Sequence, residues 1–252
     1  MVQLPALAFA MTQCSFVTVQ LARFARLTSM GGANTESKVG NPVMWAIGAD
    51  EVAAHLNLGT QKAFTWIALG LHDKESSARD HFAAGAEAVP YFADAAESWS
   101  AVLQPFSHRG SVNWLEPLKP GPVFLPGSAP EQDEPFVVIT SAGWTFDQSF
   151  DPVKALDFGR GVVEVRKNMA AVEGLHSHHS FNFPTELEID GATLTFWRDD
   201  TSMRSFAYRP GHHKTQLDRY RELHTADRTS FTRLRVLESR GSVNGSDPMA
   251  LG

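Results

Sequence analysis

The chain has 252 residues, which is long enough for one large domain or two small ones with a sizeable core. Its formal net charge of −6 gives no electrostatic footprint for DNA or RNA, so we expect no nucleic-acid partner. The single cysteine, Cys14, excludes an internal disulfide and fits a reducing compartment, so we expect a cytoplasmic protein.

The first half of the sequence predicts strands with a helix before the last of them. Glycines after residue 30 predict a loop over 31–42, and residues 50–58 are left open between a short helix and an irregular segment. Ser76 or Ser77 is expected to cap a helix over 77–88. Apolar and β-branched runs predict strands at 15–21, 43–47, 64–71 and 99–103.

The second half begins after a linker, because residues 115–135 contain six prolines. Asp190-Gly191 is the strongest short hairpin signal in the chain and predicts a turn between strands at 186–189 and 192–197. Residues 174–184, rich in histidine, are expected to form a turn or a short strand. The other predicted elements are a strand at 136–142, a helix at 151–171, a helical segment before the Pro210-Gly211 break, a helix at 212–223 and a strand at 232–237.

Part of the sequence repeats. The run Arg109-Gly110-Ser111-Val112-Asn113 recurs at residues 240–244, and each copy follows a strand-like run and a helix-like stretch with a Phe-Ala pair. Strands with helices set to one side are typical of α+β folds. We therefore predict an α+β chain of two ferredoxin-like halves, 14–114 and 136–241, joined by the linker 115–135. Such a chain forms a dimeric α/β-barrel-type fold by itself, and a homodimer stays open as an alternative.

His213 is the strongest candidate ligand. On a helix it shares a face with Leu217, Tyr220 and His224, whereas His212 shares a face with Gln216 and Arg219. The first face is more apolar, so His213 is expected to point inward. An inward imidazole on an apolar stripe is what a haem iron needs, and Leu217 and Tyr220 are then expected to contact the same cofactor. A core histidine bound to a backbone carbonyl is the ordinary alternative.

The other histidines are weaker candidates. On a strand, His176 and His178 would share one face, which suits a non-haem metal only if Glu186 or Glu188 adds a carboxylate. A solvated turn that includes His179 is the interpretation we favour for this cluster. Surface positions are expected for the scattered His55, His72, His81 and His108.

Two arginines and the tryptophans are expected to be structural. Arg109-Gly110 and Arg240-Gly241 predict structural turns, the alternative being an arginine bound to a carboxylate such as a haem propionate. The core is the expected location of the tryptophans at 45, 66, 99, 144 and 197, although some of them would have to line any pocket between the halves.

Three stretches carry a family resemblance. Ala96 to Gly110, Thr195 to Ala207 followed by Gly211-His212-His213, and Phe231 to Gly241 are similar to runs in spheroidene monooxygenases of bacterial carotenoid synthesis. That family resembles dimeric α/β-barrel haem proteins, a group that includes aldoxime dehydratases and chlorite dismutases. The proximal histidine of aldoxime dehydratases falls on His213, but this chain has Gly-His-His where the family has Gly-Pro-His, which leaves His212 as the alternative.

The resemblance implies a haem b monooxygenase. Its expected partners are dioxygen, an external electron-donor protein and an apolar polyene, which is oxidised beside its conjugated system to a hydroxyl and then a ketone. Such a substrate implies peripheral membrane contact, although no stretch approaches the roughly 20 apolar residues that span a bilayer. The alternatives are a haem-dependent dehydratase of the same scaffold and a haem-free small-molecule-binding protein.

Overall fold

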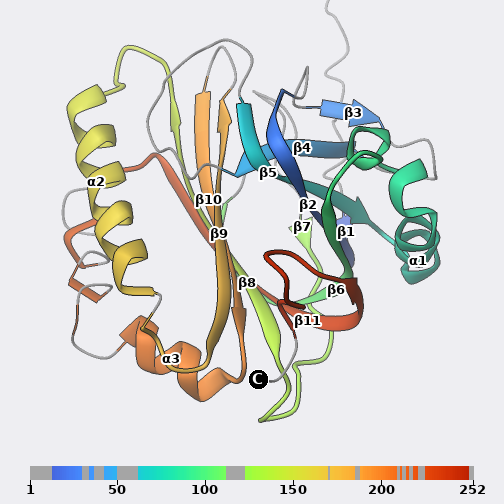
Figure 1. Ribbon diagram of the computed structural model, residues 1–252. Helices are drawn as coiled ribbons and strands as arrows, with labels where there is room; N and C mark the ends of the chain where they lie inside the picture. The colour runs from blue at the N-terminus through green and yellow to red at the C-terminus, as the bar shows by residue number, and fades with distance from the viewer. Residues whose placement is uncertain are drawn as a thin grey trace, which may run out of the picture.

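The computed structural model describes residues 13–29, 34–36, 43–49, 62–111, 123–169, 171–184, 188–208, 211, 214–215, 218–220 and 225–249 (Figure 1). The strands are β1 (Gln13–Cys14), β2 (Phe16–Ser29), β3 (Asn34–Glu36), β4 (Val43–Ala49), β5 (Lys62–His72), β6 (Glu97–Gly110), β7 (Val123–Phe124), β8 (Phe136–Thr145), β9 (Leu175–Pro184), β10 (Glu188–Trp197) and β11 (Arg228–Gly241). The helices are α1 (Glu75–Ala84), α2 (Pro152–Met169) and α3 (Asp200–Tyr208), with short 3-10 turns at Gly85–Glu87 and Pro90–Phe92.

The long strands form one sheet of two similar four-stranded parts. The order is β3-β4-β5-β2-β6-β11-β8-β10-β9, and the long strands pair antiparallel. Strands β4-β5-β2-β6 of the first part have the same arrangement as β9-β10-β8-β11 of the second. Ala49 of β4 also pairs with Phe181 of β9, so the curled sheet closes on itself. This topology is the predicted α+β class, and the predicted boundaries of the halves stay predictions.

The two parts meet along β6 and β11. The repeated Arg-Gly pairs end these strands, and Gly110 (φ +87°) and Gly241 (φ +96°) adopt the left-handed conformation that glycine tolerates best. A Cβ at either position would lie about 2 Å from a backbone carbonyl oxygen, that of Thr229 or Ser98 respectively. The repeated sequence therefore marks the ends of the two strands that form the seam between the halves.

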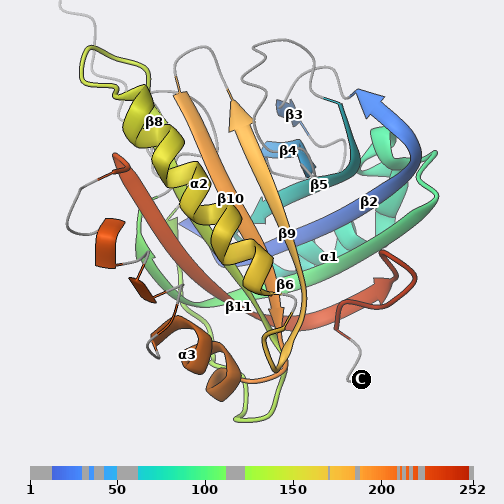
Figure 2. The same ribbon diagram turned by 60° about the vertical axis from the view of Figure 1, so that its left-hand side comes forward.

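Alternation along the strands produces two faces. The inner face fills the closed sheet with apolar side chains from both halves, and Trp99, Phe196 and Leu234 there are fully buried. On the outer face, α1 covers the first half, and α2 and α3 lie against the second half (Figures 1 and 2). We use "outer face" below for the side of the sheet that carries the helices.

Two local predictions are wrong. Asp190 and Gly191 lie inside the continuous strand β10, where they pair with Gly143 and Ala142 of β8, instead of forming a turn. Helix α1 begins at Glu75 after Lys74, and no side chain caps it, so neither Ser76 nor Ser77 is its cap. The histidine-rich segment, expected to be a turn or a short strand, is the ten-residue strand β9. For Asp190 and Gly191, pairing between distant strands overrides the local turn signal.

Candidate functional site

The outer face of the second half has a strip that its helices leave open. Thr140 lies on β8, a strand with neighbours on both sides, yet its side chain is exposed. Its cross-strand neighbours on this face, Thr193 of β10 and Phe231 of β11, are only partly buried. We call Thr140, Thr193 and Phe231 the open strip. A central sheet position is normally covered, so this strip is available to a bound molecule.

Helix α2 crosses this face of the sheet (Figure 2). Of its eighteen residues only Gly161 and Met169 are buried, and the apolar side chains of Val153 and Leu156 are 72% and 52% exposed. An amphipathic helix normally buries its apolar stripe. Val153 and Leu156 lie on the side of α2 opposite to Gly161 and Met169, so this apolar surface faces away from the sheet.

Three aromatic rings connect α2 to the sheet at one end of the strip. Phe158 of α2 packs edge-on against Trp144 of β8, with ring centroids 4.9 Å apart. Its other side meets the ring of Tyr220 at 4.3 Å. We call Trp144, Phe158 and Tyr220 the aromatic ladder. The Trp144 indole also donates to the carbonyl of Thr225 at 2.6 Å, which fixes the ring.

Tyr220 is the one predicted cofactor-contact residue that falls on the described residues. Its hydroxyl donates to the backbone carbonyl of Phe158 at 3.1 Å, and burial raises its pKa to about 12. Residues 214–215 and 218–220 are helical, as predicted for this segment, and Arg219 pairs with Asp157 of α2 at 2.7 Å. His212, His213, Leu217 and His224 lie outside the described residues, so the haem-ligand assignment stays a prediction.

The histidine-rich strand places neighbouring rings on opposite faces. His178 pairs with Thr195 and shares the outer face with it, and its buried Nδ1 has no hydrogen-bond partner among the described residues. His179 packs against Phe181 and Phe196 toward the inner face, and burial lowers its pKa to about 4. The predicted solvated turn is therefore wrong, and His178, which strand spacing had marked only as a weaker candidate for a non-haem metal, is an imidazole near the open strip.

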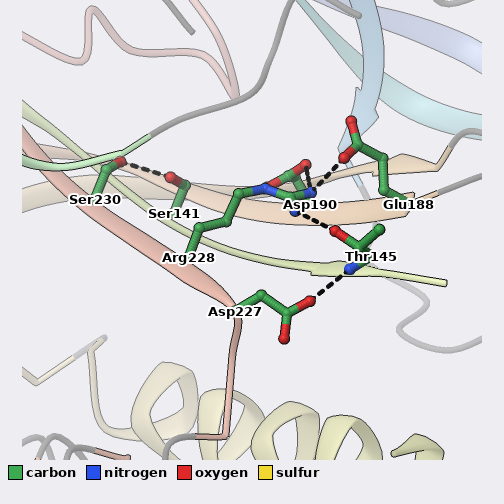
Figure 3. A network of polar contacts seen from close by, with 7 residues as sticks. All are labelled: Ser141, Thr145, Glu188, Asp190, Asp227, Arg228 and Ser230. Atoms are coloured by element: carbon green, nitrogen blue, oxygen red, sulfur yellow. Dashed lines mark hydrogen bonds and ion pairs between the residues drawn. The ribbon is translucent and has the colours of Figure 1, made fainter. Parts of the chain in front are cut away.

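Of the two carboxylates proposed for a non-haem metal, Glu186 lies outside the described residues and Glu188 is engaged elsewhere. Glu188 and Asp190 both pair with Arg228, at 3.0 and 2.6 Å, and all three side chains are almost fully buried (Figure 3). Thr145 accepts a further hydrogen bond from Arg228. Among the described residues, no three histidine, cysteine, aspartate or glutamate side chains form a metal-binding group.

Two histidines that we expected at the surface are buried. His72 and His81 are each 1% exposed, between α1 and the outer face of the first half. The hydroxyl of Thr18 lies 3.0 Å from His72 Nε2 and 3.0 Å from His81 Nδ1. His108 is also partly buried and contacts Thr232, and His55 lies outside the described residues.

Arg109, Arg240 and the tryptophans were all expected to be structural, and Arg109 is the one that differs among the described residues. Arg240 is structural: it donates to the carbonyl of Phe82 and lies over that ring, 4.3 Å from its centroid. Arg109 is exposed and lines a cavity beside α3. The tryptophans at 66, 99, 144 and 197 are buried, as predicted for core residues, and the side chain of Trp45 lies outside the described residues.

Comparison with known proteins agrees with the predicted resemblance. A spheroidene monooxygenase of Rhodobacter capsulatus is 28% identical over 200 residues, which cover 76% of this chain and 78% of the relative. No protein-family model matches the chain. The resemblance is confirmed, and it supports an oxidoreductase of the oxygenase type.

Solved structures agree with the fold. An aldoxime dehydratase covers 89% of this chain and 82% of its own, with a TM-score of 0.52 and 7% identity. A second aldoxime dehydratase, solved with butyraldoxime, covers 90% of this chain and 80% of its own, with a TM-score of 0.50 and 10% identity. These likenesses confirm the predicted fold class. No helix among the described residues is long and apolar enough to cross a membrane.

Proposed function

We propose that this chain, an oxidoreductase similar to spheroidene monooxygenase, is a haem-dependent monooxygenase that oxidises an apolar polyene. The observation that carries the proposal is the similarity to the Rhodobacter capsulatus enzyme across most of both chains. The polyene and its product, a hydroxyl and then a ketone, are inferred from that relative and from the family resemblance. Dioxygen and an electron pair from a separate donor protein complete each turnover, leaving one oxygen atom in the product and one in water.

The residues around the open strip fit a flat, largely apolar cofactor. Thr140 is exposed on a sheet face beside helices, and its neighbours Thr193 and Phe231 are only partly buried. The aromatic ladder limits one end of this region with ring surfaces. An iron tetrapyrrole would supply dioxygen activation there, while the chain provides a binding surface, an axial ligand and exclusion of water.

His213 is the residue that we propose would hold the haem iron through a ring nitrogen. It precedes Tyr220 by seven residues, about two helical turns, so a continuous helix would place both on one face. Tyr220 supports this orientation because its ring contacts α2 beside the open strip. Leu217 would contribute an apolar contact on the same face.

A reconstitution assay tests the proposal. Purified protein is loaded with haem and given spheroidene in detergent, a reductant and labelled dioxygen, and the products are analysed by mass spectrometry. We expect products that carry the oxygen label only when protein, haem and reductant are all present. Conversion of an aldoxime to a nitrile with no polyene oxidation would instead favour the dehydratase alternative, and binding of the polyene without haem uptake would favour the binding protein.

A further inference from the structure

A small cavity with three arginines lies on the outer face of the second half, beside α3. It measures about 130 Å³ and lies between the seam strands and the helix. Arg109 and Ser107 reach it from β6, Arg233 and Phe231 from β11, and Arg204 from α3. From the sequence, a carboxylate contact is only the less favoured interpretation of Arg109, and nothing there indicates that Arg204 or Arg233 lies beside it in this cavity, which we call the arginine pocket.

The arginine pocket has an excess of positive charge. The single carboxylate paired with its arginines is Asp200, which accepts hydrogen bonds from both Arg204 and Arg233. Arg109 has no hydrogen-bond or ion-pair partner among the described residues, and the Nε of Arg233 is buried without one. Guanidinium groups with unused donors are the protein groups best suited to bind a carboxylate.

Arg233 is held in place before any ligand arrives. Its guanidinium lies over the rings of Phe106 and Phe136, 4.8 and 5.1 Å from their centroids. Its side chain is only 14% exposed. Stacking fixes the plane of the guanidinium, so little conformational entropy is lost when it binds an anion.

The arginine pocket adjoins the open strip. Phe231 lines the cavity and pairs with Thr140 of the strip on one side and with Arg109 on the other. Adjacent strands lie about 5 Å apart, so an anionic substituent on a molecule over Thr140 needs to reach across only about two strands. A planar macrocycle with short acidic side chains has this reach.

We propose that the arginine pocket binds a carboxylate of the molecule that occupies the open strip, with Arg109 as the exposed contact and Arg233 as the buried one. This inference rests on the proposed function, under which the carboxylate is a haem propionate. A free small carboxylate has the same chemistry and is the other source that the experiment distinguishes.

The test compares haem with its dimethyl ester, whose propionates carry no charge. Each is titrated into the wild-type protein, Arg109→Gln and the control Arg79→Gln, and binding is followed by the Soret absorbance. Arg79 is an exposed arginine of α1 on the other half of the molecule, paired with Glu75 and Glu238. We expect Arg109→Gln to weaken haem binding roughly tenfold and to leave ester binding unchanged, because only the charged ligand loses a charge-assisted hydrogen bond.

Sodium propionate provides a second arm, followed by NMR shifts of the arginine side chains. If neither tetrapyrrole binds but propionate shifts the signal of Arg233 in the wild type and not in Arg109→Gln, the carboxylate site stands and the haem function fails. The inference is overturned if Arg109→Gln changes haem and ester affinity equally or not at all, with no response to propionate.

Discussion

At the scale of single residues, helical spacing selects His213 as a candidate ligand but does not predict the burial of the other histidines. His213 lies outside the described residues, so its environment stays a prediction. His72 and His81 stand alone in the sequence, and nothing near them indicates that both meet Thr18 of β2. Their burial depends on contacts across more than fifty residues of chain, which no local signal specifies.

The buried histidine pair predicts loss of stability in acid. Burial lowers the pKa of His72 to about 3 and that of His81 to about 4, so the unfolded chain binds protons more readily than the folded one. The stabilising contribution is complete above about pH 6.5, the ordinary histidine value, and is lost as the pH falls toward 4. Urea unfolding across this range should show a smaller loss of stability in His81→Gln than in the wild type. Equal losses in the two proteins would show that His81 does not take up a proton on unfolding.

The buried acid pair predicts a pH dependence of the opposite sign. Arg228→Met leaves Glu188 and Asp190 buried without their shared cation, which should cost about 3–5 kcal/mol at pH 8. Because burial raises the pKa of Asp190 to about 6, protonation should relieve part of this cost at pH 5. Urea unfolding at pH 5 and pH 8 measures the free energy that Arg228→Met costs at each pH. The double variant Arg228→Met/Asp190→Asn is the control, because residue 190 is then uncharged at both pH values. If Arg228→Met costs the same free energy of unfolding at pH 5 and at pH 8, the buried negative charge of Asp190 is not the cause of that cost.

At the scale of elements, the strand and helix periods predicted most of the second half, and the errors occurred where tertiary pairing decided the structure. Asp190-Gly191 has the composition of a tight turn, but Asp190 pairs with Gly143 in register and its carboxylate binds Arg228. A Cβ at Gly143 would lie 1.9 Å from an Asp190 carboxylate oxygen. Asp190 can therefore lie inside strand β10 because Gly143 of β8 leaves room for its carboxylate. Gly143 lies 47 residues earlier in the chain, so the local sequence around Asp190 does not indicate this pairing.

Two glycines give a matched test of this packing. Gly143→Ala should displace Asp190 from Arg228 and destabilise the protein by about 2 kcal/mol or more, since it separates a buried ion pair. Gly159→Ala on α2 should stabilise by about 0.5–1 kcal/mol, because no heavy atom lies within 4 Å of the added Cβ and alanine favours a helix. Thermal unfolding measures the change in stability of each variant, which should be negative for Gly143→Ala and positive for Gly159→Ala. Destabilisation by Gly159→Ala would mean that α2 packs more closely than described.

At the scale of the whole molecule, the internal repeat correctly predicted two similar halves and a sheet that needs no second chain to close. The open strip and the arginine pocket were not predictable, because Thr140, Arg109 and Phe231 come together only through the pairing of three strands. Arg109 was noted as a possible carboxylate contact, but its repeat with Arg240 favoured a structural role for both. The structure separates them, since Arg240 caps a helix end and Arg109 has no partner among the described residues.

The shared core predicts that the halves unfold together. Leu234 of β11 is fully buried in the inner core beside residues of both halves, so Leu234→Ala should destabilise by about 2–5 kcal/mol. Urea titrations can be followed by hydrogen exchange in β5 of the first half and in β10 of the second. Leu234→Ala should lower the urea midpoint of both strands by the same amount. Two separate transitions would show that the halves are independent domains.

Soret titration of three histidine variants is the most direct test of haem ligation by His213. Wild-type protein, His213→Ala, His212→Ala and His178→Ala are each titrated with haem, and the ferric and ferrous spectra are compared. We predict a sharp Soret band that weakens or shifts in His213→Ala and keeps its wild-type position in the other two. A wild-type spectrum in His213→Ala, above all with loss of the band in His178→Ala, would contradict the proposed ligand.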